Sequence, residues 1–445
     1  MHSRIAKSIE DRFPQLVEAQ PELVARHFSE AGLADKAIPY WLIAARLAAA
    51  RSANMEAIAH LRSGLDCAQA LAPGASRSKV ELSLQLALGG PLIAAKGFAS
   101  NEAEAAYQRA RELSRELQSD ADLLAALGGL SYVYLVRANL RGATSLLDEA
   151  VALAKRGAEP ELLTDADHFA GQLSFFLGQF QSSRDRLKTI VEAGGYRRPY
   201  QFEVYGIDTR VLYRGYIGHC DWHLGYPVRS LKIAEDGLAL ARDISHPFSV
   251  ALALDYLAML NQFRREADAA LKAAEEAGKI CAQYRFDYYG AWSNLVRAWA
   301  IGESGRFDEG LAAYDAALDE FRRTGAGLRI SHHLGLRAAL HGKAGRASEG
   351  VRLIDEAFAV ARANNESWRD AELHRERGEL FLLASVPDAE NQADREFQTA
   401  IEIAATQGAK LPELRATVAR ARHQAARGER QQATRHPDAD LWLVQ

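Results

Sequence analysis

Cysteine, long apolar runs and a signal-peptide-like start are all scarce or missing in this chain of 445 residues. The three cysteines, Cys67, Cys220 and Cys281, form no CxxC pair, so we expect reduced thiols instead of a disulfide framework. The longest apolar stretch, 86–95, contains two glycines and a proline and is far shorter than the ~18–20 residues that span a bilayer. These absences predict a cytoplasmic protein with no membrane partner.

Signatures of catalysis are also absent. The net charge of −4 argues against a chain built to wrap nucleic acid. The pairs at 278–279 and 342–343 are Gly-Lys, but neither has the upstream glycine or the following hydroxyl residue of a phosphate loop. No spacing favours a nucleophile or an acid/base pair. We therefore expect no catalytic residue, no cofactor and no enzyme activity.

What the sequence does contain is a repeat. A glycine or other small residue is followed five positions later by another small residue, between apolar helical stretches. From Ala138 to Gly178 is 40 residues, and from Gly305 to Gly345 is again 40. Such a period predicts an all-α fold, a right-handed α-solenoid of antiparallel helical hairpins. The occurrences are 32–37, 138–143, 178–183, 225–230, 305–310, 345–350 and, decayed, 428–433.

The unit at 291–324 shows the residue pattern of one predicted hairpin. Trp292, Leu295 and Trp299 fall on one helical stripe, and Gly305 then breaks the helix. A second stripe follows from Leu311, and Gly310 is small where the two helices approach. Comparable hairpins are predicted at 22–51, 121–156, 162–193, 209–243, 248–283, 328–363 and 368–406, with less regular helices at 54–71, 77–95 and 100–117.

We expect three regions along the chain. Residues 1–120 form a helical region of irregular register, 121–406 a regular solenoid, and 407–445 an incomplete terminal repeat and tail. The irregular segment 194–208 is either a functional loop or an enlarged connector. The missing half of the last hairpin indicates either a truncated gene or a docking site for another chain.

The positions of small and aromatic residues resemble the tetratricopeptide repeat. Around Gly305, the matching residues are Ala298, Phe307, Gly310, Tyr314 and Ala317. The period near 40 exceeds the usual 34 and is similar to the longer repeats of bacterial signalling ATPases, including the maltose-regulon activator type.

A second resemblance covers residues 2 to about 430. Over this range the sequence is similar to the C-terminal repeat region of bacterial fusion proteins that join a class III adenylate/guanylate cyclase to an AAA-like ATPase. The resemblance implies a signalling context and no cyclase activity, because the catalytic motifs are missing from this sequence. The segments that carry it are 20–33, 51–65, 84–89, 224–227, 240–249 and 371–380.

In a tetratricopeptide array the first helix of each hairpin lines the concave face. Aromatic and polar residues there resemble a partner-binding surface, although each of them taken singly is at least as well explained as packing between hairpins. Registering each unit on its glycine places ten residues on this face: Asp165, His168, Gln172, Phe175, Phe176, His219, Trp222, His223, Trp292 and Trp299.

Two further features, a pair of histidines and a basic stretch near the C-terminus, could indicate ligand binding. His219 and His223 share one helix face, as metal ligands do, but no third ligand can be assigned, so we expect no metal. The stretch 410–435 carries seven basic residues against two glutamates. A solvated terminal face explains it better than nucleic-acid binding, because no aromatic residues interleave to stack bases.

The sequence thus predicts a non-catalytic scaffold that binds a protein or peptide in bacterial signal transduction, with a cyclase or ATPase chain as one candidate partner. One alternative is a solenoid that senses a ligand or peptide and controls a separate ATPase, cyclase or transcription regulator. The other is a truncated fragment of a cyclase fusion. The sequence leaves the oligomeric state open.

Overall fold

The structure is a computed structural model that describes residues 1–157, 160–192, 206–384 and 387–427, with backbone alone at 157, 160–163 and 165. Its described residues form 22 helices and no strand, which confirms the all-α prediction. The helices are α1 His2–Arg12, α2 Pro14–Ala19, α3 Pro21–Glu30, α4 Ala34–Ala50, α5 Asn54–Gln69, α6 Ala75–Lys96, α7 Asn101–Glu116, α8 Asp120–Val136, α9 Leu140–Gly157, α10 Pro160–Phe176, α11 Phe180–Glu192, α13 Thr209–His223, α14 Pro227–Ile244, α15 Pro247–Arg264, α16 Ala267–Tyr284, α17 Asp287–Glu303, α18 Phe307–Arg323, α19 Ile330–Lys343, α20 Ala347–Asn364, α21 Asp370–Ala384, α22 Ala389–Gln407 and α23 Lys410–Ala426.

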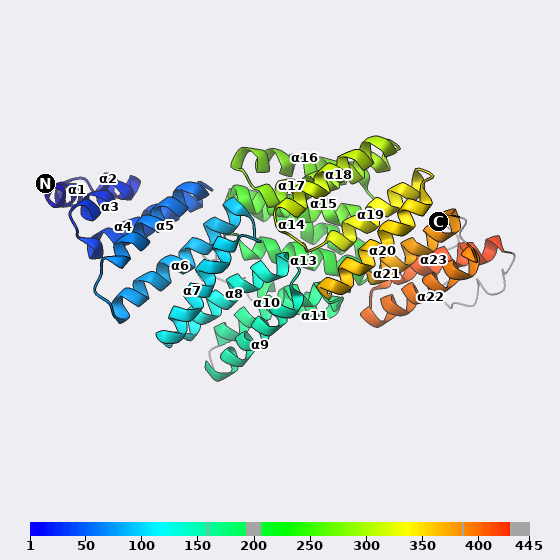
Figure 1. Ribbon diagram of the computed structural model, residues 1–445, viewed down its shortest axis with the longest axis horizontal. Coiled ribbons are helices and arrows are strands. Elements are labelled where there is room, and N and C mark those ends of the chain that lie inside the picture. Colours follow the sequence, from blue (N-terminus) through cyan, green and yellow to red (C-terminus); the bar gives the residue numbers. More distant parts are fainter. Residues whose placement is uncertain (158–159, 193–205, 385–386, 428–445) are drawn as a thin grey trace.

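Successive helices pair into antiparallel hairpins that stack along the long axis of the molecule (Figure 1). The first helices α15, α17, α19 and α21 begin at 247, 287, 330 and 370, so the period near 40 is confirmed. Helices α1–α5 lie at one end of this axis and α21–α23 toward the other. Most of the predicted loop 194–208 and the predicted decay after Gly428 lie outside the described residues.

In the described repeats the first small residue lies at the turn between two helices, whereas α15 and α16 turn at Arg265, with φ +62°. Gly305 has φ +90° and Ala138 has φ +61°, both in the left-handed region that reverses the chain between two helices. Five positions after Gly305, a Cβ on Gly310 would lie 2.5 Å from the backbone nitrogen of Gly302. The second small residue is therefore needed because α17 and α18 touch backbone to backbone.

The two helices of a hairpin differ in their surroundings. In α15, 14 of 18 residues are buried, whereas in its partner α16 only five of 18 are. First helices such as α15 are thus covered on all sides, and second helices such as α16 turn one face to solvent. Cys220 and Cys281 are buried free cysteines, and Cys67 is a half-buried one.

The array also coils tightly enough that residues about 190 positions apart in the sequence come into contact. The carbonyl oxygen of Val136, at the end of α8, accepts the backbone N–H of Gly327 at 2.9 Å. One hairpin further, the carbonyl oxygen of Phe176 accepts the backbone N–H of Ser367 at 2.9 Å. Phe98 and Tyr288 make the same kind of contact through their rings, with centroids 5.6 Å apart. These contacts close the interior of the superhelix.

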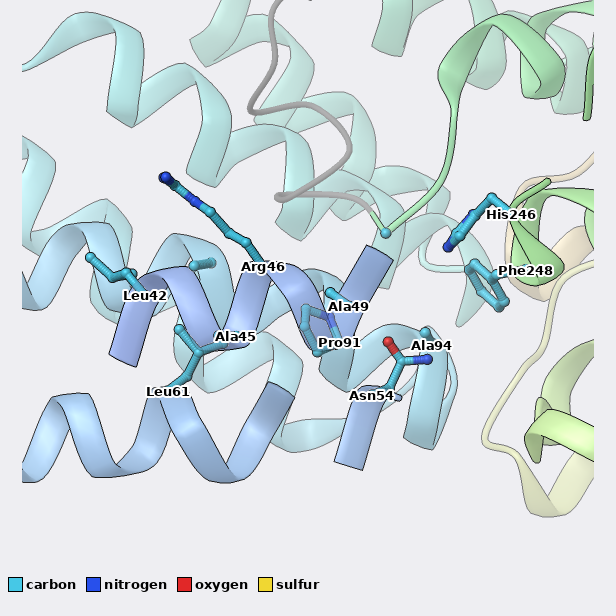
Figure 2. Close-up of a pocket in the computed structure, with 12 residues that line it drawn as sticks. Leu42, Ala45, Arg46, Ala49, Asn54, Leu61, Pro91, Ala94, His246 and Phe248 are labelled. Carbon is cyan, nitrogen blue, oxygen red and sulfur yellow. The ribbon is translucent and has the colours of Figure 1, made fainter. Parts of the chain in front are cut away.

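A small cavity of about 20 Å³ lies where the N-terminal helices α4, α5 and α6 meet the start of α15. In Figure 2, Leu42, Ala45 and Leu61 form its apolar side, and His246 and Phe248 stand opposite them. That volume holds about one water molecule, so the cavity is a packing gap too small for an organic ligand. In the described part of the chain, no helix has the length and apolar character needed to cross a bilayer.

Candidate functional site

A groove with a volume of about 820 Å³ opens between α21, α22 and α23, and we call it the C-terminal groove. This volume lies within the range of about 300–1,000 Å³ in which proteins bind ligands. The groove is lined by Arg265, Arg375, Glu379, Leu382, Glu390, Phe397, Leu414, Arg415, Val418, Ala419, Arg422, His423, Ala426 and Arg427.

Charged side chains of α21, together with Arg369 just before it, form a buried network around Arg375, which lines the C-terminal groove. Arg375 donates to Glu372 at 2.8 Å, and Arg369 to Glu376 at 3.1 Å, with all four side chains at most 6% exposed. Burial alone would raise the pKa of Glu372, but Arg375, Arg415 and Arg369 hold it below its ordinary value. Because each charge has an opposite partner, the network can remain ionised inside the protein.

Arg415 links α23 to the inner wall. Its guanidinium donates to the backbone carbonyl oxygen of Phe263 and lies 4.7 Å from the ring centre of Trp222. A third contact joins it to Glu372 at 3.6 Å. Burial lowers the pKa of Arg415 to about 10, against the attraction of Glu372, so the side chain remains a cation at neutral pH.

The rim adds charge and apolar surface. Arg422 is exposed on α23, and Leu414 and Val418 on the same helix are half-buried. Arg265, on the opposite side, is 31% exposed and lies 3.6 Å from Glu376. The ring of His423 makes a 3.1 Å hydrogen-bond contact with the backbone carbonyl oxygen of Glu390.

The C-terminal groove is therefore basic with an apolar strip, since five arginines line it against two glutamates. A second groove, of about 650 Å³, lies between α16, α17 and α18. Its lining mixes Lys279 and Arg297 with Glu275, Asp287 and Glu320, so it favours neither sign of charge. Charge of one sign distinguishes the C-terminal groove from this second one.

The ten residues expected on an open concave face belong to α10, α13 and α17. The side chain of Asp165 is outside the described set. The other nine lie inside the closed superhelix, each at most 3% exposed: His168, Gln172, Phe175, Phe176, His219, Trp222, His223, Trp292 and Trp299. The expectation of an accessible partner surface there does not describe this conformation.

The physical reason is the later turn of the superhelix. Trp368, between α20 and α21, packs its ring 5.3 Å from that of Phe175 and 6.0 Å from that of Phe176. It also lies 5.4 Å from His332. Side chains that would face a partner in an open array are covered by residues almost 200 positions further along.

The two histidines of α13 are each engaged separately. The Nε2 of His219 lies 2.8 Å from the backbone oxygen of Tyr256, and the Nδ1 of His223 lies 2.8 Å from that of His219. No group of three or more metal-ligating side chains that could hold an ion occurs among the described residues.

Sequence reasoning missed most of the C-terminal groove. Arg415 and Arg422 fall in the basic stretch 410–435, for which the sequence favours a solvated terminal face. Arg375 falls in the segment 371–380 that carries the family resemblance. One sequence signal could have revealed the groove. Glu372, Arg375 and Glu376 are charged residues on the first helix of a hairpin, and first helices are otherwise buried.

Comparison with known proteins places the chain only by fold. No protein-family model matches it. It is 23% identical over 427 residues to an uncharacterised protein of Rhizobium meliloti (strain 1021), a match that covers 95% of this chain and 40% of that protein. The chain thus spans less than half the length of this relative.

Among solved structures, the chain is similar to a Rap protein complexed with Competence and Sporulation Factor. The two share 14% identity with a TM-score of 0.51, over 79% of this chain and 99% of that one. It is also similar to the apo form of the quorum sensor NprR from B. thuringiensis, with 14% identity and a TM-score of 0.46 over 81% and 96% of the chains. The Rap likeness agrees with a tetratricopeptide-like solenoid.

Proposed function

We propose that this chain is a non-catalytic tetratricopeptide-like module that binds an acidic segment of a partner protein, or an acidic peptide, in the C-terminal groove. The observation that carries this proposal is the lining of five arginines beside a half-buried apolar strip. The regular repeats at 121–406 then serve as a rigid support, and the third region, from 407, supplies helix α23.

Guanidinium groups suit such a partner because their planar fork of donors matches a carboxylate in two parallel hydrogen bonds. Arg422 is exposed and forms no ion pair with the residues that the structure describes, so it is available to an incoming carboxylate. Leu414 and Val418 offer apolar contact next to it. Charge would fix the orientation of the segment, and the apolar strip would add buried area.

The biological setting we propose is bacterial signal transduction, with a cyclase or ATPase chain, or a transcription regulator, as the controlled partner. Two observations support it: the resemblance of the repeats to those of cyclase–ATPase fusions, and a curated relative more than twice the length of this chain. The Rap structure holds Competence and Sporulation Factor, which favours a peptide as a second type of occupant.

The test is fluorescence anisotropy with two labelled peptides of equal length, one rich in glutamate and leucine and one in which lysine replaces every glutamate. We expect saturable binding of the acidic peptide alone, weakening as salt rises. Arg422→Ala should reduce this affinity at least several-fold, whereas Arg141→Ala, at an exposed position on α9, should not. Equal binding of both peptides, or equal effects of both substitutions, would contradict the proposal.

A further inference from the structure

Arg329 is an arginine buried in the middle of the superhelix. It is 2% exposed and directly precedes α19 with φ +69°, a left-handed conformation that is strained for a side-chain-bearing residue. The preceding residues Gly327 and Leu328 both donate backbone N–H groups to the carbonyl oxygen of Val136, at 2.9 and 3.0 Å. The surrounding fold therefore holds Arg329 in place.

Aromatic rings enclose the guanidinium. Its central carbon lies 4.4 Å from the ring centre of Trp292 and 5.0 Å from that of Phe176. Its terminal nitrogens donate to the hydroxyl oxygens of Tyr256 at 3.1 Å and Tyr288 at 3.3 Å. All of these partners are neutral, and cation–π attraction offsets only part of the cost of removing a cation from water.

No carboxylate of the described chain lies within 4 Å of Arg329, so it forms no ion pair there. Asp255 and Glu366, two carboxyl groups whose pKa the charge of Arg329 influences, are themselves buried, and burial raises the pKa of both. Two buried N–H donors that line this region also lack a hydrogen-bond partner among the described residues: the Nε of Arg329 and the Nε1 of Trp292. A buried cation and unused donors together indicate a missing small anion.

A cavity beside Arg329 supplies the space. It has a volume of about 20 Å³ and is lined by Tyr132, Gln172, Tyr216, Tyr256, Tyr288 and Arg329 among others. This volume admits one species about as large as a water molecule. Chloride is only slightly larger than water, whereas phosphate, sulfate or any carboxylate-bearing molecule needs several times as much room.

We propose that this cavity binds a chloride ion. Arg329 supplies the positive charge. The hydroxyl of Tyr288 accepts a hydrogen bond from Arg329, which leaves its own proton to donate to the ion. The ion would neutralise the centre of the closed superhelix and so stabilise the contacts between α8, α15, α17 and α19. This site is separate from the C-terminal groove and does not depend on the function proposed there.

The experiment compares the thermal midpoint of the purified chain in sodium chloride, sodium bromide and sodium gluconate at equal ionic strength. We expect a saturable rise of a few degrees in chloride and bromide over gluconate, because a ligand that binds only the folded state stabilises it. Arg329→Gln and Tyr288→Phe should reduce or abolish this difference. The exposed-site control Arg141→Gln should keep it.

Crystals grown with bromide provide a second readout that requires no variant. An anomalous peak within hydrogen-bonding distance of Arg329 would support the site even if Arg329→Gln fails to fold. Equal midpoints in all three salts, together with no peak or with peaks confined to the surface, would overturn the proposal. A halide effect that persists in Tyr288→Phe without any weakening, and a peak that does not contact Arg329, would also overturn it.

Discussion

Ser367 donates its backbone N–H to the carbonyl oxygen of Phe176 across 2.9 Å, although about 190 residues separate the two in the chain. Trp368 follows with a second contact to the same oxygen, at 3.3 Å. These hydrogen bonds join two turns of the superhelix. Their consequence is that the inner face becomes a core, and the accessible basic surface lies at the end of the array, in the C-terminal groove.

Trp368 should be the side chain whose loss most weakens this closure. Its ring contacts Phe175 and Phe176 of α10 and His332 of α19, so it joins two helices that are far apart in the chain. Trp368→Ala is expected to lower the free energy of unfolding by about 3–5 kcal/mol, as for other large buried aromatics. Urea denaturation measures this, with Leu383→Ala as the control because Leu383 is 61% exposed. Equal, small losses in both variants would mean that the turns do not pack as described.

Gly310 should tolerate no side chain. Gly310→Ala places a Cβ 2.5 Å from the backbone nitrogen of Gly302, so α17 and α18 must separate. We expect a loss of about 1–3 kcal/mol in the free energy of unfolding. In Gly278→Ala the nearest atom to the new Cβ is 4.0 Å away, so that control should be neutral or slightly stabilising, by up to about 1 kcal/mol. Chemical denaturation of both variants gives the comparison, and equal effects would contradict the crossing.

Ala138 stands where five other repeats have a glycine with positive φ. A φ of +61° is unfavourable for a residue with a Cβ. Ala138→Gly should therefore raise the free energy of unfolding by between zero and about 1 kcal/mol. The same change at Ala282, exposed within α16, should destabilise by about 1 kcal/mol. Opposite signs in thermal denaturation confirm the turn geometry, and equal losses contradict it.

Acid should open the superhelix. Burial lowers the pKa of His168, His219 and His223 to about 3, well below the ordinary value near 6.5. Between these values the unfolded chain binds more protons than the folded one, so stability is retained above about pH 6.5 and falls as the pH drops. Each histidine contributes a slope of about 1.4 kcal/mol per pH unit.

Buried carboxyl groups act in the opposite sense. Burial raises the pKa of Asp255 and Glu366, so their contribution to stability is lost as the pH rises. Histidines outnumber these carboxyls, so urea midpoints should still fall from pH 7 to pH 5. His223→Gln should flatten this dependence, while His2→Gln, at an exposed position, should leave it unchanged. A midpoint that is constant over this interval would contradict the burial of the histidines.

The hairpins could be predicted from the sequence because their signals are local. The break at Gly305 and the close approach at Gly310 both follow from neighbours within one hairpin. The contact between Phe176 and Ser367 could not be predicted, because it depends on small rotations summed over five hairpins. The sequence therefore places the candidate residues on inward-facing helices, but it does not show that a later turn of the superhelix covers them.

The C-terminal groove shows the same limit. The basic stretch 410–435 is visible in the sequence, but Arg265, directly after α15, and Arg375, in α21, join it from earlier parts of the chain. Trp222, one of the predicted partner residues, lies beneath Arg415 of this groove, with its ring centre 4.7 Å from the guanidinium. Its role there is to support the guanidinium from below, since only 2% of its surface is exposed.

The most direct test of the account is amide hydrogen exchange on the full chain, with and without a saturating acidic peptide. The account predicts added protection in α21 and α23, around Arg375 and Arg415, and little change in α10, α13 and α17. Protection concentrated in α10 and α17, around Phe176 and Trp292, would show that the superhelix opens and binds its partner inside, and would contradict the C-terminal groove as the binding site.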